Sequence, residues 1–447
     1  MNTIEQIVSL TNEMEPELVR CRRDFHKYAE TGWFEMRTSS LIARELTNLG
    51  YEVLVGDQVC QKEARMGVAS DEVLEQQYQR AVAQGADPEF VEYTRGGMTG
   101  VIGILRCGEG PTVALRFDID ALGVFEATEE GHLPADQGFR SVNEGFMHAC
   151  GHDGHATVGL GVARVLMAIK DQLHGTVKLI FQPAEEGVRG AKSIVEKGHL
   201  DGVDYFLGSH VTARKKDEPY HIYPGAYGSL ATCKYDVVYR GRAAHAGAAP
   251  HQGKNAMLAA ATAVLNLNAI PRHGAGSTRI NVGTLVAGSG RNVIADEAKM
   301  EIEVRGGNTE LNRYMCDYAQ RILESAAVMH DCTCQIRLMG AADSLQSDET
   351  LCRLVSRVCS GKLGMSVPDA LMTRSGGSED ISYMMNRVQE QGGQATFMRI
   401  IADMKGGAHN RAFDFSEDFL TNGVKIFCAC VAELMAAPEN GAETVKL

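Results

Sequence analysis

The stretch Thr176-Val-Lys-Leu-Ile-Phe-Gln-Pro-Ala-Glu-Glu-Gly187 gives the most direct indication of the fold. It opens with six residues of an apolar, β-rich run and closes with a turn that carries two adjacent carboxylates, Glu185 and Glu186. In open α/β sheets, binding and catalytic groups gather outside the carboxyl ends of the strands. The stretch therefore predicts a buried strand that delivers two acidic side chains to a functional edge.

Three further apolar runs lead to side chains of the same kind. Residues 112–117 are followed by Asp118 and Asp120, residues 205–207 by Gly-Ser-His210, and residues 395–401 lead to Gly-Gly-Ala-His409. Packing alone does not require four strands to carry acids or histidines at one end. With 48 glycines for tight turns and only 11 prolines, the chain has the texture of an α/β protein.

The N-terminal part combines helical segments with a long excursion. Apolar positions at helical spacing predict helix over residues 3–50, and residues 51–55 and 101–105 are expected strands. Between these strands lies a polar excursion, residues 57–97, whose middle part at residues 71–83 has helical composition. A connection of this length is usually functional or forms an interface.

Composition excludes several classes of function. The 44 basic and 57 acidic residues give a net charge of −13, which disfavours binding to nucleic acid or to an anionic membrane. No apolar run approaches the roughly 18 uncharged residues of a membrane span, and the N-terminus shows no targeting signal. The twelve cysteines lack a framework spacing, so free thiols in a reducing cytoplasm are expected.

Between residues 225 and 340 the pattern changes. Strands are expected at residues 232–239, 279–286, 299–305 and 332–339, and helices at residues 255–268 and 311–329. This βαββαβ order is that of a split-βαβ sandwich. We therefore expect a discontinuous catalytic domain, residues 1–224 and 341–447, interrupted by an inserted lid domain, residues 225–340.

The densest cluster of reactive side chains is Met147-His-Ala-Cys-Gly-His-Asp-Gly-His155, at the mouth of a helix expected over residues 154–169. Thiolate and imidazole groups suit borderline divalent metal ions, and an acid in the same run binds metal or orients a histidine. The less specific interpretation is a polar capping loop with incidental histidines, which the richness of the run disfavours. Asp118-Ile-Asp120 is a moderately specific pattern that either orients a ligand or belongs to the metal site.

Adjacent carboxylates at a strand end point in different directions, so one of Glu185 and Glu186 can bind metal while its neighbour faces the reacting centre. Single histidines such as His210 and His409 are more often structural residues than ligands. Together with Cys150, His152 and Glu186, however, His210 and His409 make five potential ligands for a pair of metal ions. A two-metal site holds a carbonyl and activates water, which fits hydrolysis of an amide or peptide.

Candidate substrate contacts lie in the inserted segment. His245, on the Gly/Ala-rich loop at residues 241–250, suits donation to a developing oxyanion, and a plain surface residue is the equal alternative. Arg291, Asn292 and Arg305 offer donors for a substrate carboxylate, because a guanidinium group matches a carboxylate bidentately.

The motifs together resemble those of the dinuclear metallo-amidohydrolases, a family that includes hippurate hydrolase, N-acyl-amino-acid deacylases and plant auxin-conjugate hydrolases. They occur in the family's order over nearly the whole chain: Arg22-Arg-Asp-Phe-His-Lys-Tyr-Ala-Glu30, Arg116-Phe-Asp-Ile-Asp-Ala-Leu122, residues 147–155, 182–187 and 241–250, and His409-Asn410. The resemblance implies an α/β fold: a mixed-sheet, zinc-peptidase-like catalytic domain with an inserted split-βαβ (ferredoxin-like) lid that also serves in dimerisation.

The resemblance also implies roles for the candidate residues. Glu185 would act as general base and acid, and Asp120 would orient the ligands without binding the metals. His245 would reach across a dimer to the active site of the other subunit. Two divalent metal ions, Mn²⁺ before Zn²⁺, would be held by Cys150, His152, Glu186, His210 and His409.

Residues 63–68 and 287–293 resemble in particular the branch of the family that cleaves p-aminobenzoyl-glutamate, a folate breakdown product, to p-aminobenzoate and glutamate. Two alternatives stay open. The first is the same chemistry on another N-acyl amino acid or dipeptide. The second is a non-catalytic, metal-binding subunit that acts with a related B subunit; the complete ligand set beside Glu185 disfavours it, because a retired site would have lost some of these residues.

Overall fold

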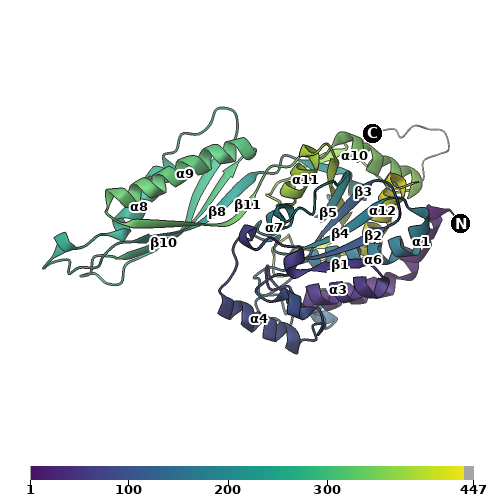
Figure 1. The fold of residues 1–447 in the computed structure, drawn as a ribbon, viewed down its shortest axis with the longest axis horizontal. Coiled ribbons are helices and arrows are strands. Elements are labelled where there is room, and N and C mark those ends of the chain that lie inside the picture. Colours follow the sequence, from purple (N-terminus) through teal and green to yellow (C-terminus); the bar gives the residue numbers. More distant parts are fainter. Residues whose placement is uncertain (1, 437–447) are drawn as a thin grey trace. The chain divides into compact units, whose positions relative to one another are not determined.

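The computed structural model describes residues 2–436, which form two compact units (Figure 1). Unit 1 takes the chain up to Tyr227, the stretch Leu345–Arg374, and the chain from Tyr383 onward. Unit 2 takes Gly228–Ser344 together with Ser375–Ser382. The domain ranges 1–224, 225–340 and 341–447 stay a prediction, because compactness does not show that either part folds or functions alone.

A mixed seven-stranded sheet forms the centre of unit 1, with the strand order β1-β2-β4-β3-β5-β13-β6. The neighbours β4, β3, β5 and β13 are parallel to one another, whereas β1, β2 and β6 pair antiparallel. The carboxyl ends of the four central strands therefore lie at one edge, as predicted. The strands are β1 (Glu52–Val55), β2 (Val101–Arg106), β3 (Thr112–Asp118), β4 (Thr176–Gln182), β5 (Tyr205–Ala213), β6 (Ile222–Tyr223) and β13 (Gln394–Ala402).

Two short strand pairs and ten α-helices, besides several short 3-10 and π segments, accompany the sheet in the described part of unit 1. The strand pairs are β7 (Gly225–Tyr227) with β12 (Met372–Arg374), and β14 (Met404–Lys405) with β15 (Asp414–Phe415). The helices are α1 (Thr3–Glu13), α2 (Glu15–Lys27), α3 (Met36–Leu49), α4 (Asp71–Ala83), α5 (Leu133–Asp136), α6 (His152–Ala168), α7 (Ala191–Glu196), α10 (Glu349–Arg357), α11 (Ile381–Glu390) and α12 (Asp418–Leu434). Across the described residues, no helix combines the length and apolarity needed to cross a membrane.

The continuous helix predicted over residues 3–50 is wrong, because the chain forms three helices there, with the main break at residues 28–35. Within the break, the buried Glu30 carboxylate accepts hydrogen bonds from the backbone N–H groups of Arg37 (3.1 Å) and Thr38 (2.9 Å). These amides belong to the first turn of α3, which has no helical partner for them. A carboxylate supplied by the preceding turn thus starts a new helix where the apolar spacing alone predicts continuation.

Strand β5 is longer than predicted, and His210 lies inside it. The pairing with β13 continues from Tyr205 to Ala213, whereas the pairing with β3 ends at Gly208. His210 therefore follows the last residue of β5 that β3 covers. The expectation that His210 follows the end of its strand is wrong for β5 itself, but the residue still lies past the β3 pairing, at the edge where Asp118 and Gln182 end their strands.

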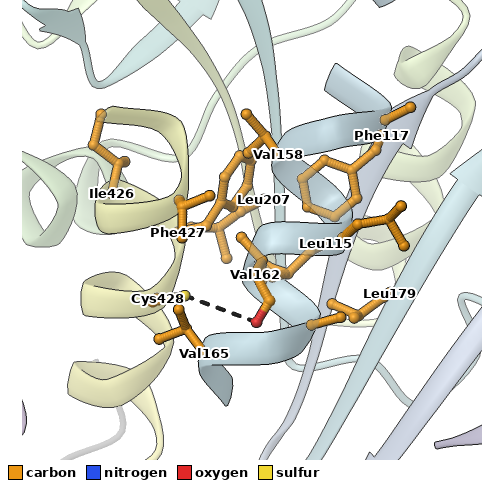
Figure 2. Packing of buried hydrophobic residues seen from close by; sticks show 14 of the residues in the cluster. Leu115, Phe117, Val158, Val162, Val165, Leu179, Leu207, Ile426, Phe427 and Cys428 are labelled. Atoms are coloured by element: carbon orange, nitrogen blue, oxygen red, sulfur yellow. Dashed lines mark hydrogen bonds between the residues drawn. The ribbon is translucent and has the colours of Figure 1, made fainter. Parts of the chain in front are cut away.

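The hydrophobic core of unit 1 is formed where α6 and α12 pack against the sheet (Figure 2). The ring of Phe117 on β3 lies 5.6 Å from that of Phe181 on β4 and 5.0 Å from that of Phe427 on α12. Gly159 of α6 faces these rings, and a Cβ at this position would lie 2.6 Å from Phe181 and 2.8 Å from Phe117. The glycine therefore sets how closely α6, which begins at His152, approaches the sheet.

Unit 2 is a four-stranded antiparallel sheet with the order β11-β8-β10-β9 and two helices. The chain order βαββαβ confirms the predicted split-βαβ fold. Val237, Met300 and Leu323 belong to the separate core of this unit. Its elements are β8 (Ala231–Arg240), α8 (Ala256–Asn268), β9 (Thr278–Ala287), β10 (Glu297–Gly306), α9 (Thr309–Met329) and β11 (Thr333–Ala342).

A buried ion network joins α2 to two distant segments of unit 1. The fully buried guanidinium group of Arg22 donates from Nε to Asp153 (2.9 Å), at the start of α6, and from Nη2 to Asp414 (2.7 Å), in β15. His26 contacts the same Asp153 carboxylate at 2.8 Å. Burial would raise the pKa of Asp153, but Arg22 and His26 outweigh it and lower that pKa below its usual range. The network thus keeps an ionised carboxylate directly after His152.

We predict that Arg22→Met lowers the free energy of unfolding by about 3–5 kcal/mol, because it leaves two buried carboxylates without their cation. Urea denaturation followed by fluorescence or circular dichroism measures this. Arg20→Met on the same helix is the control, because Arg20 is exposed and its loss should cost no more than about 0.5 kcal/mol. Equal stabilities of the two variants would contradict the structural role of the network.

Candidate metal centre

The carboxyl edge of the parallel strands gathers six side chains that can bind or serve a metal ion. Cys150 lies just before α6 and His152 begins it; Glu185 and Glu186 come from the turn after β4, His210 from β5, and His409 from the loop between β14 and β15. Their potential ligand atoms form three groups in which all atoms lie within 4.8 Å of one another: Cys150/His152/His210, Cys150/Glu186/His409 and His152/Glu185/Glu186. The structure thus brings together all five predicted ligands and Glu185.

His152 presents a ring nitrogen, Nε2, that makes no hydrogen bond within residues 2–436; Asp118 Oδ2 lies 3.7 Å from it. Its Nδ1 donates to the carbonyl oxygen of Asp120 at 2.8 Å, which leaves the Nε2 lone pair 4.0 Å from Glu186 Oε1. Both atoms are buried, and neither makes a hydrogen bond. Because buried polar atoms in proteins nearly always have a partner, this pair fits two ligands that face the same cation.

Gly151 makes this arrangement possible. It lies between Cys150 and His152 with a φ of 91°, in the left-handed region that glycine adopts without strain. A Cβ at this position would lie 2.6 Å from the Val211 side chain. The glycine therefore lets the chain turn sharply between two candidate ligands and begin α6 at His152.

His155 lies one turn further along α6 and is a structural residue by its contacts. Its Nδ1 donates to the Asp118 carboxylate, and its Nε2 accepts the backbone N–H of Val211 at 3.0 Å. Both ring nitrogens are therefore in use, which leaves none for a metal. Asp118 in turn pairs with the buried Arg116. The sequence motifs contain Arg116, Asp118 and His155. Their spacing alone, however, does not show that both ring nitrogens of His155 are engaged whereas one of His152 is not.

Cys150 and His210 face each other, with 3.3 Å between Sγ and Nε2. His210 donates from Nδ1 to the carbonyl oxygen of Val211 at 2.6 Å, so its Nε2 carries the lone pair. Burial raises the pKa of the Cys150 thiol, and a nearby divalent cation is the kind of group that ionises such a thiol. The pair suits a metal that accepts sulfur and imidazole ligands.

The turn that carries the two glutamates is held by buried carboxylates on its backbone. The N–H groups of Glu185 and Glu186 donate to Oδ1 and Oδ2 of Asp120, each at 2.9 Å, and the N–H of Ala184 donates to Glu35 Oε1 at 2.7 Å. Asp120 thus engages both oxygens with the backbone, which favours the predicted orienting role over direct metal binding. Glu35 is an isolated glutamate without motif spacing, so the sequence alone carries no signal for its role.

Negative charge accumulates at this edge. Burial, together with the nearby Asp120 carboxylate, raises the pKa of Glu35 to about 8 and that of Glu186 to about 7. A group of buried carboxylates of this kind requires protons or cations to compensate it. The donor set of one thiol, three imidazoles and carboxylate oxygens fits divalent cations chemically.

His409 completes the cluster from the loop between β14 and β15. Its backbone N–H donates to the Ala149 carbonyl oxygen at 2.7 Å, and its Nε2 lies 3.6 Å from Glu186 Oε1. The residue has a φ of 64°, uncommon for a non-glycine residue, and its side chain is 56% exposed. Its loop is therefore fastened next to Cys150 while the imidazole keeps access from solvent.

Three of the predicted substrate contacts lie close together in unit 2. The backbone N–H of Ala246 donates to the Asn292 carbonyl oxygen at 3.0 Å, which joins the loops of His245 and Arg291. His245 Nδ1 accepts the backbone N–H groups of Gly247 (3.1 Å) and Ala248 (3.0 Å). The neutral ring therefore carries its proton on Nε2, in an exposed side chain ready to donate.

Arg305 lies at the opposite end of the same sheet. Glu297, at the start of β10, pairs with Arg240, whereas Arg305 pairs with Thr232 at the start of β8. Glu297 and Arg305 are eight residues apart along β10, which is about 26 Å in an extended strand. Unit 2 therefore does not bring Arg305 together with Arg291 and Asn292 around one carboxylate.

Arg305 instead belongs to a basic hollow that sequence analysis did not predict. The hollow has a volume of about 450 Å³, and Arg279 on the neighbouring strand is the direct cross-strand partner of Arg305. Arg305 donates to Glu303 at 2.9 Å, and the guanidinium groups outnumber this one carboxylate. Its lining residues are Arg272, Thr278, Arg279, Ile280, Asn281, Glu303 and Arg305.

Two curated proteins are similar to the chain over nearly its whole length. It is 41% identical over 423 residues to the A subunit of p-aminobenzoyl-glutamate hydrolase from Escherichia coli (strain K12), covering 94% of this chain and 97% of that protein. It is also 41% identical over 414 residues to indole-3-acetyl-aspartic acid hydrolase of Enterobacter agglomerans, covering 92% of this chain and 94% of that protein.

Solved structures agree with this fold. An aminobenzoyl-glutamate utilization protein from Klebsiella pneumoniae superposes with a TM-score of 0.80 at 35% identity, covering 95% of this chain and 97% of that one. The Bacillus subtilis YXEP protein, described as a dinuclear metal-binding peptidase, superposes with a TM-score of 0.64 at 25% identity, covering 95% and 99%. The model of peptidase family M20/M25/M40 matches residues 114–433. With the metal-ligand cluster at the sheet edge and these similarities along its length, the chain belongs to peptidase family M20/M25/M40 and is a metal-dependent hydrolase.

Proposed function

We propose that the chain hydrolyses the amide bond of p-aminobenzoyl-glutamate and releases p-aminobenzoate and glutamate. The observation that carries the proposal is the buried His152–Glu186 ligand pair directly beside Glu185. Such an arrangement combines a site for divalent cations with an acid–base group at the same point. The similarity to the A subunit of p-aminobenzoyl-glutamate hydrolase supports this substrate.

Two divalent cations would be held by Cys150, His152, Glu186, His210 and His409. When bound, they supply Lewis acidity toward a carbonyl oxygen and lower the pKa of a water molecule. We favour Mn²⁺ over Zn²⁺, although one thiolate among harder ligands accommodates either ion.

The residues of the chain then divide the work of amide hydrolysis. Glu185 takes a proton from the attacking water and passes it to the amine nitrogen that leaves. Asp120 keeps Glu185 in place through the backbone N–H that it accepts. His245 donates from Nε2 to the developing oxyanion, which its hydrogen-bonded Nδ1 favours. We propose that this histidine serves the active site of a partner subunit.

The acidic amino acid is the part of the substrate that we assign with most structural support. The two relatives at 41% identity are named for conjugates of glutamate and aspartate, whereas their acyl groups differ. Arg272, Arg279 and Arg305 offer an excess of guanidinium groups for two carboxylates. We therefore propose Arg305, with Arg279 beside it, for the carboxylates of the acidic half, and Arg291 and Asn292 at the other end of unit 2 as the alternative contacts.

The surface of unit 2 supports a dimer. Helix α8 contains no charged residue, and on its outward face Leu258 is 50% and Leu265 74% exposed. Strand β9 is the outer strand of its sheet, and its Val286 is 70% exposed. An apolar helix face beside an unpaired strand edge fits a second copy of this chain or a related B subunit.

The two alternative functions would use parts of the same site. Another N-acyl amino acid or dipeptide would use the same cations and Glu185, and the difference would lie only in the acyl group. A non-catalytic metal-binding subunit of a heteromer would not need Glu185 fastened at the ligand cluster by Asp120. The observed fastening therefore favours catalysis.

The proposed reaction predicts that the purified chain with Mn²⁺ releases p-aminobenzoate from p-aminobenzoyl-glutamate. EDTA should abolish the release and added Mn²⁺ should restore it, because the ligand cluster supplies no Lewis acid by itself. Chromatographic detection of p-aminobenzoate measures the reaction. No release from a folded, metal-loaded chain would contradict this substrate for the chain alone, and other N-acyl amino acids with and without a partner subunit would be assayed next.

Glu185→Gln should lower kcat by about 10²–10⁴-fold, because the amide removes the proton acceptor while keeping the shape of the side chain. Metal content, measured by elemental analysis, should stay that of the unaltered protein, since Glu186 provides the carboxylate ligand. If metal is lost in parallel with activity, Glu185 is a ligand and the acid–base role is wrong.

Arg279→Met and Arg305→Met should each raise KM for N-acyl glutamates and aspartates by about 10–100-fold, because a charged hydrogen bond is lost. The same variants should change kcat/KM for the corresponding N-acyl leucine by no more than about threefold. Arg313→Met, an exposed change on α9 outside the hollow, is the matched control. An equal effect on acidic and apolar substrates would refute the recognition role.

A further inference from the structure

The turn at residues 184–189 is held in a strained backbone shape. Ala184 and Val188 have φ values of 51° and 60°, in the region that non-glycine residues rarely adopt, and Gly187 between them has a φ of 83°. Such conformations cost of order 1–3 kcal/mol each and persist only where the surroundings enforce them. The strained residues flank Glu185 and Glu186, so whatever enforces this shape also aims the two carboxylates.

The Glu35 side chain binds the backbone of Ala184, the first of the strained residues. It is completely buried, and its Oε1 accepts the backbone N–H of Ala184 at 2.7 Å. Its other oxygen, Oε2, accepts the hydroxyl of Thr99 at 2.7 Å. Both oxygens of the Glu35 side chain are therefore engaged, Oε1 by the turn and Oε2 by Thr99.

The end of the same turn is held by Arg189. Its Nε donates to the Glu186 carbonyl oxygen at 2.8 Å, and its Nη1 reaches the Gly67 carbonyl oxygen at 3.4 Å. Gly67 belongs to the long excursion at residues 57–97. Next to it, the Met66 carbonyl oxygen accepts the indole N–H of Trp33 at 2.7 Å.

Close packing adds to these hydrogen bonds. A Cβ at Gly32 would lie 2.4 Å from Arg189 and 3.0 Å from the Ala184 Cα, so residues 32–35 rest directly on the turn. Trp33, in this segment, is completely buried and has a φ of 70°. The break between α2 and α3 and the excursion thus meet at this turn, joined by the Trp33–Met66 hydrogen bond.

We propose that Glu35 is a positioning residue for catalysis, which together with Arg189 locks the 184–189 turn so that Glu185 and Glu186 keep their directions. Its role in turnover rests on the proposed function, whereas the locking itself is independent of it. Glu35 acts through the Ala184 N–H and does not touch substrate or metal. The excursion at residues 57–97 contributes by accepting hydrogen bonds from Arg189 and Trp33 on its backbone carbonyl oxygens.

The test compares Glu35→Met, which removes both acceptors, with Glu35→Gln, whose carbonyl oxygen still accepts from Ala184 while its amide group donates to the Thr99 hydroxyl. Glu30→Met is the matched control. Glu30 is equally buried and also accepts two donors, but these belong to α3 and not to the turn. Each variant is examined as the whole chain by amide hydrogen exchange and by steady-state kinetics with Mn²⁺.

In Glu35→Met, the peptide that contains residues 184–187 should exchange at least about tenfold faster, because a buried N–H has lost its partner. Its kcat should fall by about 100-fold with KM changed by no more than threefold, as expected when a catalytic group is misplaced by about 1 Å. Glu35→Gln should restore both properties to within about fivefold of the unaltered protein. Glu30→Met should lose stability but keep the exchange of this peptide and kcat.

Unchanged exchange in Glu35→Met would overturn the locking role, and faster exchange with an unchanged kcat would overturn the link to catalysis. Failure of Glu35→Gln to restore kcat would also refute positioning by hydrogen bonds. If the unaltered protein does not cleave p-aminobenzoyl-glutamate, the proposed function fails, and the exchange measurements alone decide the locking role. Should Glu35→Met not fold, Thr99→Val, which removes the donor to Oε2 and so releases one end of the Glu35 carboxyl group, should still speed exchange of this peptide and lower kcat, and no change in either would overturn the proposal.

Discussion

The burial of several carboxylates at one sheet edge is the constraint on which the rest of unit 1 depends. Glu35, Asp118, Asp120, Glu185 and Glu186 are all buried there. Each carboxylate must find donors or cations, because an isolated buried charge costs several kcal/mol. Arg116 and His155 serve Asp118, and backbone N–H groups serve Asp120 and Glu35. In the ligand cluster, His152 and His409 lie 4.0 Å and 3.6 Å from Glu186 Oε1, a spacing at which divalent cations have the appropriate charge.

Hydrogen bonds, more than residue type, decide which histidines are available to a cation. His152 and His210 use Nδ1 on backbone carbonyl oxygens and keep an Nε2 lone pair. His155 is fully engaged by Asp118 and a backbone N–H. His245 shows the reverse pattern of His152, since its Nδ1 accepts two N–H groups and its proton is therefore on Nε2. The neighbours that each ring meets thus decide whether a histidine has a nitrogen available to bind a cation, has both nitrogens engaged, or has an N–H available to donate.

The two units contain different chemical groups. Unit 1 contains the ligand cluster and the glutamate turn, whereas the excess of guanidinium groups around one hollow belongs to unit 2. Within unit 2, Arg305 lies near one end of the four-stranded sheet, and the loop that carries His245 lies near the other end. A small substrate cannot touch both ends of one copy of this unit. This separation agrees with a proposed active site that takes His245 from a partner subunit.

The sequence by itself determined the α/β class, the split-βαβ insertion and the residues of the ligand cluster. These follow from local patterns, because parallel strands bring their carboxyl ends to one edge whatever the details of packing. Only the tertiary structure decided that the helix predicted over residues 3–50 breaks at residues 28–35, and that Glu35 holds the 184–189 turn. It also decided that His152 and not His155 keeps a free nitrogen, and that Arg305 is distant from Arg291. These features depend on hydrogen-bond partners and strand register contributed by residues far apart in the chain, which no local spacing records.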